Sequence, residues 1–125
     1  MSDDWHKAET YKSLIAISIE GFKFCALANG GAAVAILAYL GNVAGKGRVL
    51  PDMAWPMVFF SLGLGACGAA VLCSYLTQLQ LYDEERRSVP ESDRKHLRYL
   101  HCGLLCVAAS IVLFVVGSMV AVCKY

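Results

Sequence analysis

The chain has 125 residues, of which 58% are hydrophobic and 17% charged, and its formal net charge is +1. A soluble domain carries about a quarter charged residues, so this composition argues against an ordinary soluble domain. The near-zero net charge gives no indication of a nucleic-acid partner. We expect one membrane domain over residues 1–125, with the lipid bilayer as its main surroundings.

Residues 1–13 form a polar leader whose aromatic residues, Trp5 and Tyr11, suit the headgroup zone of a membrane. The first predicted helix, over residues 14–44, would be roughly 45 Å long. That length exceeds a hydrocarbon core of about 30 Å. We therefore expect this helix to tilt or to extend into the cytoplasm.

The second predicted helix covers residues 53–82 and the third covers residues 94–123, joined by a cytoplasmic connection over residues 83–93. Asp52 is a suitable N-cap for the second helix, and Pro56 falls in its first turn, where proline is tolerated. Each of the three helices exceeds the roughly 20 residues needed to cross a bilayer. The sequence thus predicts an all-α integral membrane protein with three transmembrane helices that extend into the cytoplasm.

Positive charges are distributed unequally between the two sides of such a protein. The side with the N-terminus and the second connection carries seven: Lys7, Lys12, Arg86, Arg87, Arg94, Lys95 and Arg98. The other side carries three, at Lys46, Arg48 and Lys124. Lysine and arginine near the ends of spans favour the cytoplasm. We therefore expect a multi-pass protein of the cell inner membrane, with the N-terminus cytoplasmic and the C-terminus outside.

Small residues occur in all three predicted spans, where close backbone approach drives helix association. The candidates for helix packing are Gly30, Gly65, Gly68, Gly103 and Gly117. In the third helix Ser110 lies midway between two of these glycines, at a spacing of seven. The second helix has glycine on more than one face, which favours a homo-oligomer. Packing within one protomer is the alternative explanation.

Ionisable groups inside a membrane indicate ion or substrate paths, and the candidates here are Glu20, Lys23 and His101. All three fall at the expected cytoplasmic rim, and we favour an ordinary interfacial belt of snorkelling side chains over an ion or substrate path as the explanation. Asn29 is the strongly polar side chain of the bilayer interior. We interpret it as an interhelical hydrogen-bonding group or as part of a pore lining.

Six cysteines lie inside or at the rim of the apolar helices, where a thiol behaves as a small hydrophobe. Cys102 and Cys106 share a helix face, and Cys25, Cys73 and His101 lie in the same half of the bilayer. A metal site there would bury thiolates without a second histidine or carboxylate. We therefore expect no metal and no cofactor. No catalytic motif occurs, so we expect no catalytic residue and no enzymatic activity.

One stretch of the chain supports a resemblance to a known group of proteins. Residues 29–42 (NGGAAVAILAYLGN), following residues 9–15 (ETYKSLI), resemble the first span of small uncharacterised bacterial inner-membrane proteins. The resemblance implies only a bacterial inner membrane, because those proteins have no activity that could be transferred to this chain. Two better-known families fit less well. Phage holins of three spans are similar in length but typically place the N-terminus outside. Small multidrug transporters carry one glutamate in the first of four spans, whereas this chain has three predicted spans and Glu20 lies near the rim.

Two functions fit this sequence. The first is a small oligomeric membrane protein that is channel-like or membrane-perturbing, as in a bacterial stress or defence effector. The alternative is a non-conducting membrane anchor or regulatory interaction subunit of a larger complex, with a protein partner at the cytoplasmic connection. Neither involves nucleic acid.

Overall fold

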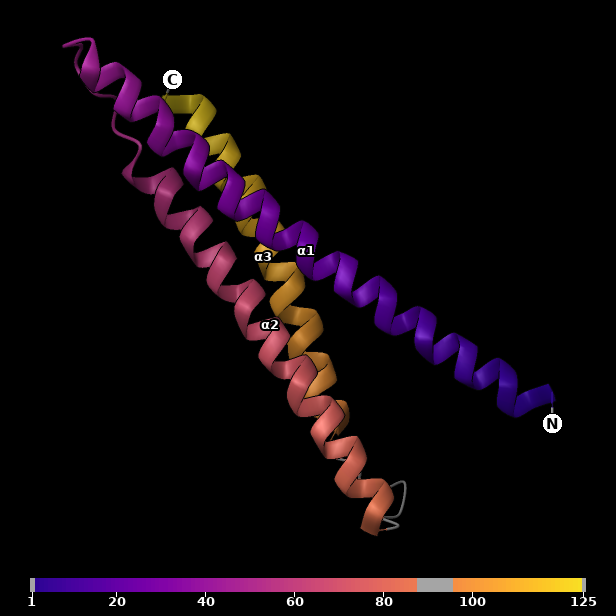
Figure 1. Cartoon of the computed structure of the whole chain (residues 1–125). Helices are drawn as coiled ribbons and strands as arrows, with labels where there is room; N and C mark the ends of the chain where they lie inside the picture. Colours follow the sequence, from indigo (N-terminus) through magenta and orange to yellow (C-terminus); the bar gives the residue numbers. More distant parts are fainter. Residues whose placement is uncertain (1, 88–95, 125) are drawn as a thin grey trace.

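The computed structural model describes residues 2–87 and 96–124, which form three α-helices (Figure 1). They are α1 (Ser2–Gly45), α2 (Ala54–Arg87) and α3 (His96–Lys124). Each is long and apolar enough to cross a membrane. The prediction of an all-α chain with three helices of spanning length is confirmed, and these helices indicate a multi-pass membrane protein.

Two helix boundaries differ from the predicted ones by five residues or more. α1 begins at Ser2, so the polar leader is helical. It contains no proline or glycine, and it gains a salt bridge of 3.1 Å between Lys12 and Glu9. Hydropathy shows where a helix leaves the apolar phase and not where the helix ends, so the helix extends beyond the apolar stretch. α2 likewise continues to Arg87, into the predicted connection. The predicted start of the third helix, at residue 94, lies outside the described residues.

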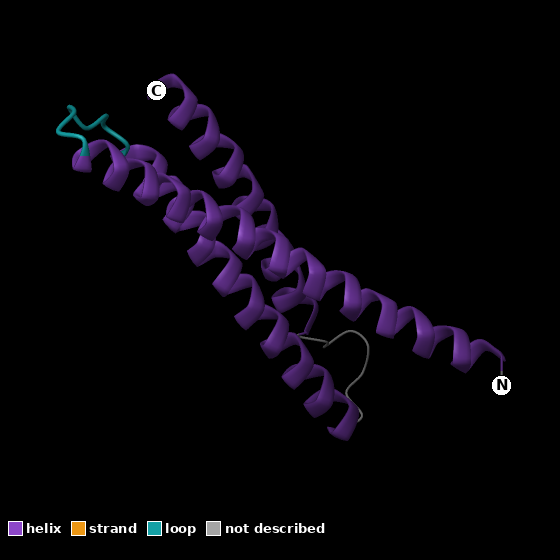
Figure 2. Cartoon of the chain, turned by 45° about the horizontal axis from the view of Figure 1, so that its top comes forward, coloured by secondary structure: helices purple, strands orange, loops and turns teal. Residues whose placement is uncertain are grey.

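α2 and α3 pack side by side as an antiparallel pair, and α1 crosses this pair and diverges from it toward the N-terminus (Figures 1 and 2). The N-terminus and the end of α2 therefore lie at one end of the molecule. The C-terminus and the α1–α2 connection lie at the other, where Lys124 Nζ is 3.5 Å from Asp52 Oδ2. At 1.5 Å per residue α1 is about 66 Å long, which exceeds the roughly 30 Å thickness of a hydrocarbon core.

The α1–α2 connection is closed by local hydrogen bonds. The amide of Gly47 donates to Ala44 O at 3.0 Å, and the amide of Arg48 donates to Val43 O at 3.3 Å. Gly47 has a φ of 65°, in the left-handed region that glycine adopts at helix C-termini. The amide of Ala54 donates to Asp52 Oδ1 at 3.2 Å, as expected for a capping aspartate.

The protomer buries only a narrow seam where the three helices meet. Fully buried side chains include Cys25, Asn29, Phe60 and Ser110. Large apolar side chains on the outer surfaces are exposed instead, for example Leu27 (74%) and Leu105 (72%). An apolar surface on every side is unfavourable in water and suits a lipid solvent.

Candidate functional site

The most polar part of the seam is a junction centred on Asn29, which is 0% exposed. Asn29 Nδ2 donates to Ser110 Oγ at 3.1 Å and lies 3.3 Å from Ser110 O and 3.1 Å from Cys25 O. Ser110 Oγ in turn donates to Gly63 O at 2.7 Å. Side-chain hydrogen bonds therefore connect α1 to α3 and α3 to α2 at one level of the apolar region. We call this group of Asn29, Ser110 and Gly63 the polar junction.

Gly63 belongs to the junction because it has no side chain. A Cβ built on Gly63 would overlap Asn29 Oδ1 and would lie 2.6 Å from Asn29 Cγ. Asn29 Oδ1 is buried and accepts no conventional hydrogen bond within residues 2–87 and 96–124. It faces the Cα of Gly63, a position suited to the weak Cα–H···O contacts that recur between closely packed helices. The site thus selects for glycine.

Gly63 is not among the packing glycines predicted from the sequence. A signal was nevertheless present, because Phe60, Gly63, Cys67 and Ala70 recur at spacings of three and four, which is the period of one helix face. All four are buried in the structure. This is the face of α2 that packs within the protomer.

The five predicted packing glycines occupy two different environments. A Cβ on Gly117 would lie 3.0 Å from Phe60 Cε1 and 3.1 Å from Phe59 Cβ, and one on Gly103 would lie 3.4 Å from Cys73 Cβ. These two glycines are therefore at the α2–α3 interface. The other three have nothing within 4 Å of a built Cβ: they are the half-buried Gly30 and the exposed Gly65 and Gly68.

The four predicted pore or rim residues do not form a single site. Glu20 and Lys23 form an exposed salt bridge of 2.8 Å on α1. His101 is exposed on α3, where its Nδ1 lies 2.6 Å from Leu97 O. Because a carbonyl only accepts, Nδ1 is the donor in this hydrogen bond. Asn29 is separate from all three, inside the protomer.

A contact between the ends of α2 and α3 was not predicted. Glu84 Oε2 lies 2.6 Å from His96 Nδ1, and Glu84 Oε1 accepts the backbone amide of His96 at 3.1 Å. Both side chains are 12% exposed. One carboxylate therefore binds the first residue of α3 through its backbone and its ring, and this holds the two helix ends together.

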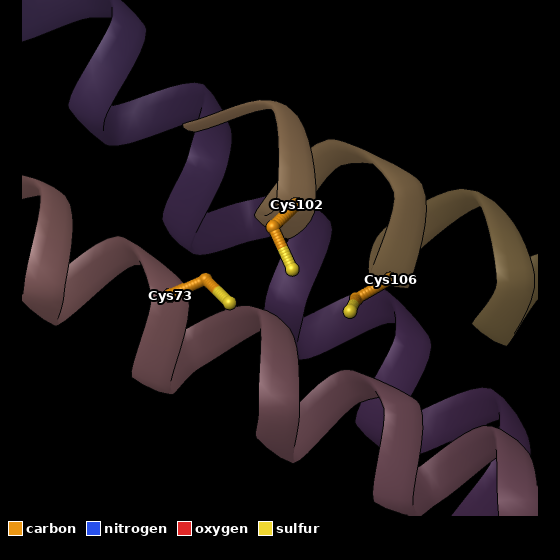
Figure 3. A group of neighbouring side chains, drawn as sticks. All are labelled: Cys73, Cys102 and Cys106. Carbon is orange, nitrogen blue, oxygen red and sulfur yellow. The ribbon is translucent and has the colours of Figure 1, made fainter. Parts of the chain in front are cut away.

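Three thiols meet between α2 and α3 (Figure 3). Cys73 comes from α2, Cys102 and Cys106 come from α3, and their sulfurs point toward one another. All three sulfurs lie within 4.8 Å of one another. The sequence predicted that Cys102 and Cys106 share a face of α3. The packing of α2 against α3 brings Cys73 to the same place. We call these residues the thiol cluster.

Comparisons with protein-family models, with curated proteins and with solved structures found no match for this chain. Its function is therefore argued from the geometry. The polar junction supplies hydrogen bonds between helices, and its buried position separates it from solutes. The thiol cluster supplies sulfur atoms that can act as ligands.

Proposed function

We propose that this chain is an oligomeric, non-conducting interaction subunit of the cell inner membrane. The observation that carries this proposal is the burial of Asn29 and Ser110 in the polar junction. Ion passages are selected by polar or charged groups along their walls, around any hydrophobic constriction. Here Asn29 and Ser110 are buried and join the helices of one protomer, which supports a role in packing over a role in a wall.

The proposed contact between copies is the outer face of α2, which carries Ser61, Gly65 and Gly68. All three are exposed, and the two glycines have nothing within 4 Å of a built Cβ. Small residues let backbones approach closely, and such contacts replace the hydrophobic force that is absent between helices in lipid. A second copy offers the same face, so a symmetric contact of α2 with α2 satisfies both protomers.

Leucine at Gly65 or Gly68 is expected to weaken assembly, because its side chain holds the two backbones apart. We expect on the order of a tenfold rise in the dissociation constant, about 1.4 kcal/mol. Single-molecule photobleaching in dilute bilayers measures this. Gly41→Leu is the matched control, since Gly41 is an exposed glycine of α1 with equally open surroundings. Unchanged assembly for both α2 variants would mean that this face contacts lipid.

The non-conducting character is tested by ion flux in liposomes that contain only the purified protein. We expect no flux above that of empty liposomes at any protein-to-lipid ratio. Flux that rises with protein content and disappears in Gly65→Leu, but not in Gly41→Leu, would contradict the proposal. It would instead support a channel formed between protomers, the other function that the sequence allows.

The proposed orientation gives a separate prediction. With the N-terminus in the cytoplasm, residues 83–93 face the cytoplasm and Lys46 and Arg48 face outside. Single cysteines placed at residues 46 and 90 in a chain without its native cysteines should react with an impermeant thiol reagent from opposite sides. If residue 46 were labelled only from the cytoplasmic side, the proposed orientation would be the wrong way round.

A further inference from the structure

We propose that the thiol cluster is a binding site for a soft, thiophilic metal ion, with Cu(I) as the ion it fits best. Thiolate sulfur prefers Cu(I) and zinc over the hard cations. The cluster offers three such ligands from two helices, at Cys73, Cys102 and Cys106. This site is independent of the assembly proposed above.

The sulfur geometry is close to that of a three-coordinate site. Three atoms within 4.8 Å of one another all lie within about 2.8 Å of a common point. Metal–sulfur bonds are about 2.3 Å long, so no sulfur has to move inward by more than about 0.5 Å to bind an ion at that point. A disulfide would instead bring two sulfurs to about 2.05 Å, would leave the third unused and would require an oxidant.

The depth of the cluster in the membrane allows the ion to enter. Cys73 lies about 29 Å along α2 from Ala54, and Cys102 and Cys106 lie about 33 and 27 Å along α3 from Lys124. With the opposite rim set at the salt bridge between Asp52 and Lys124, a hydrocarbon core of about 30 Å reaches to about the level of the cluster. All three thiols therefore lie near the interface, where a thiol can release its proton to water as the metal binds.

The number of ligands separates Cu(I) from zinc. Structural zinc is bound by four ligands in a tetrahedron, and the cluster contains three. The adjacent His101 is outside it, with its Nδ1 hydrogen bonded to Leu97 O at 2.6 Å. Cu(I) is satisfied by two or three sulfurs, so the described residues complete its coordination without a further group.

The test is competition for Cu(I) between the full-length, reduced protein in nanodiscs and a chromophoric Cu(I) chelator, under anaerobic conditions. We expect one Cu(I) per chain, with three sulfurs at about 2.3 Å by X-ray absorption. Cys73→Ser and Cys102→Ser should each weaken binding by at least about 100-fold, the upper end of the loss caused by removing an outer-shell partner. The matched control is Cys123→Ser, because Cys123 is an exposed cysteine at the opposite end of α3.

Several results would overturn the site. These are the absence of competition by the wild-type protein, an equal loss in Cys123→Ser, or fewer than two sulfurs around the bound ion. If the protein bound Zn²⁺, added by itself, more tightly than it bound Cu(I), the assignment to Cu(I) would be overturned. The absorption measurement uses the unaltered chain, so the site stays testable if a serine variant does not fold.

Discussion

Gly63→Leu is expected to lower the free energy of unfolding of the protomer by about 3 kcal/mol, the upper end of what overpacking a filled interior costs. The new side chain would occupy the space of the Asn29 amide, which is 0% exposed. It would also separate the amide from Ser110, and a hydrogen bond between helices in a membrane is worth about 0.6 kcal/mol on average. The steric contribution is therefore the larger one. SDS titration in mixed micelles measures the unfolding.

The matched control is Gly65→Leu, the same substitution two residues away on the same helix. Gly65 is exposed and has nothing within 4 Å of a built Cβ. At protein concentrations where the chain is monomeric, this variant should be no less stable than the wild-type protein, because the new side chain meets no close neighbour and leucine favours the helix over glycine. If the two variants were destabilised equally, α2 would not present Gly63 to α1.

A double-mutant cycle isolates the contact itself. Gly63→Ala adds only the methyl group that overlaps Asn29 Oδ1. In an Asn29→Ala background that oxygen is absent, so the same methyl group should cost much less, and the two substitutions should be non-additive by about 1 kcal/mol or more. Strict additivity would place Asn29 away from Gly63.

The three apolar spans followed from hydropathy, but the faces of α2 did not. In a soluble helix the polar residues show which face is outside. In lipid the outer face is as apolar as the inner one. Periodicity places Gly63 and Gly65 on different faces of α2, but apolarity alone does not show that the face of Gly63 is buried and that of Gly65 exposed.

Polar residues in the spans were easier to place. Asn29 is costly to expose to lipid, and burial among helices was one of its two expected outcomes. The thiol cluster, in contrast, could not be predicted in full from the sequence. The spacing of Cys102 and Cys106 is visible in the sequence, but the third member depends on how α2 and α3 are aligned. Periodicity within one helix carries no information about the alignment with its neighbour.

Gly117 is the site of the second large effect. A Cβ there would lie 3.0 Å from Phe60 Cε1, which is closer than ordinary van der Waals contact. Phe60 is 2% exposed, and its ring centroid is 5.9 Å from that of Phe114. The ring therefore has little room to move away, and Gly117→Leu should cost about 2 to 3 kcal/mol of protomer stability.

Alanine at Gly117 and at Gly103 distinguishes this close packing from a general effect of replacing glycine in α3. At Gly103 the nearest atom to a built Cβ is Cys73 Cβ at 3.4 Å, which is ordinary contact. Alanine also favours the helix over glycine by about 0.8 to 1.0 kcal/mol, so Gly103→Ala should be neutral or stabilising. At Gly117 the close contacts with Phe59 and Phe60 oppose the same gain in helix stability. Gly117→Ala should therefore be the less stable of the two variants in SDS titration. The reverse order would mean that α2 and α3 are aligned differently along their common interface, with Gly117 away from Phe60.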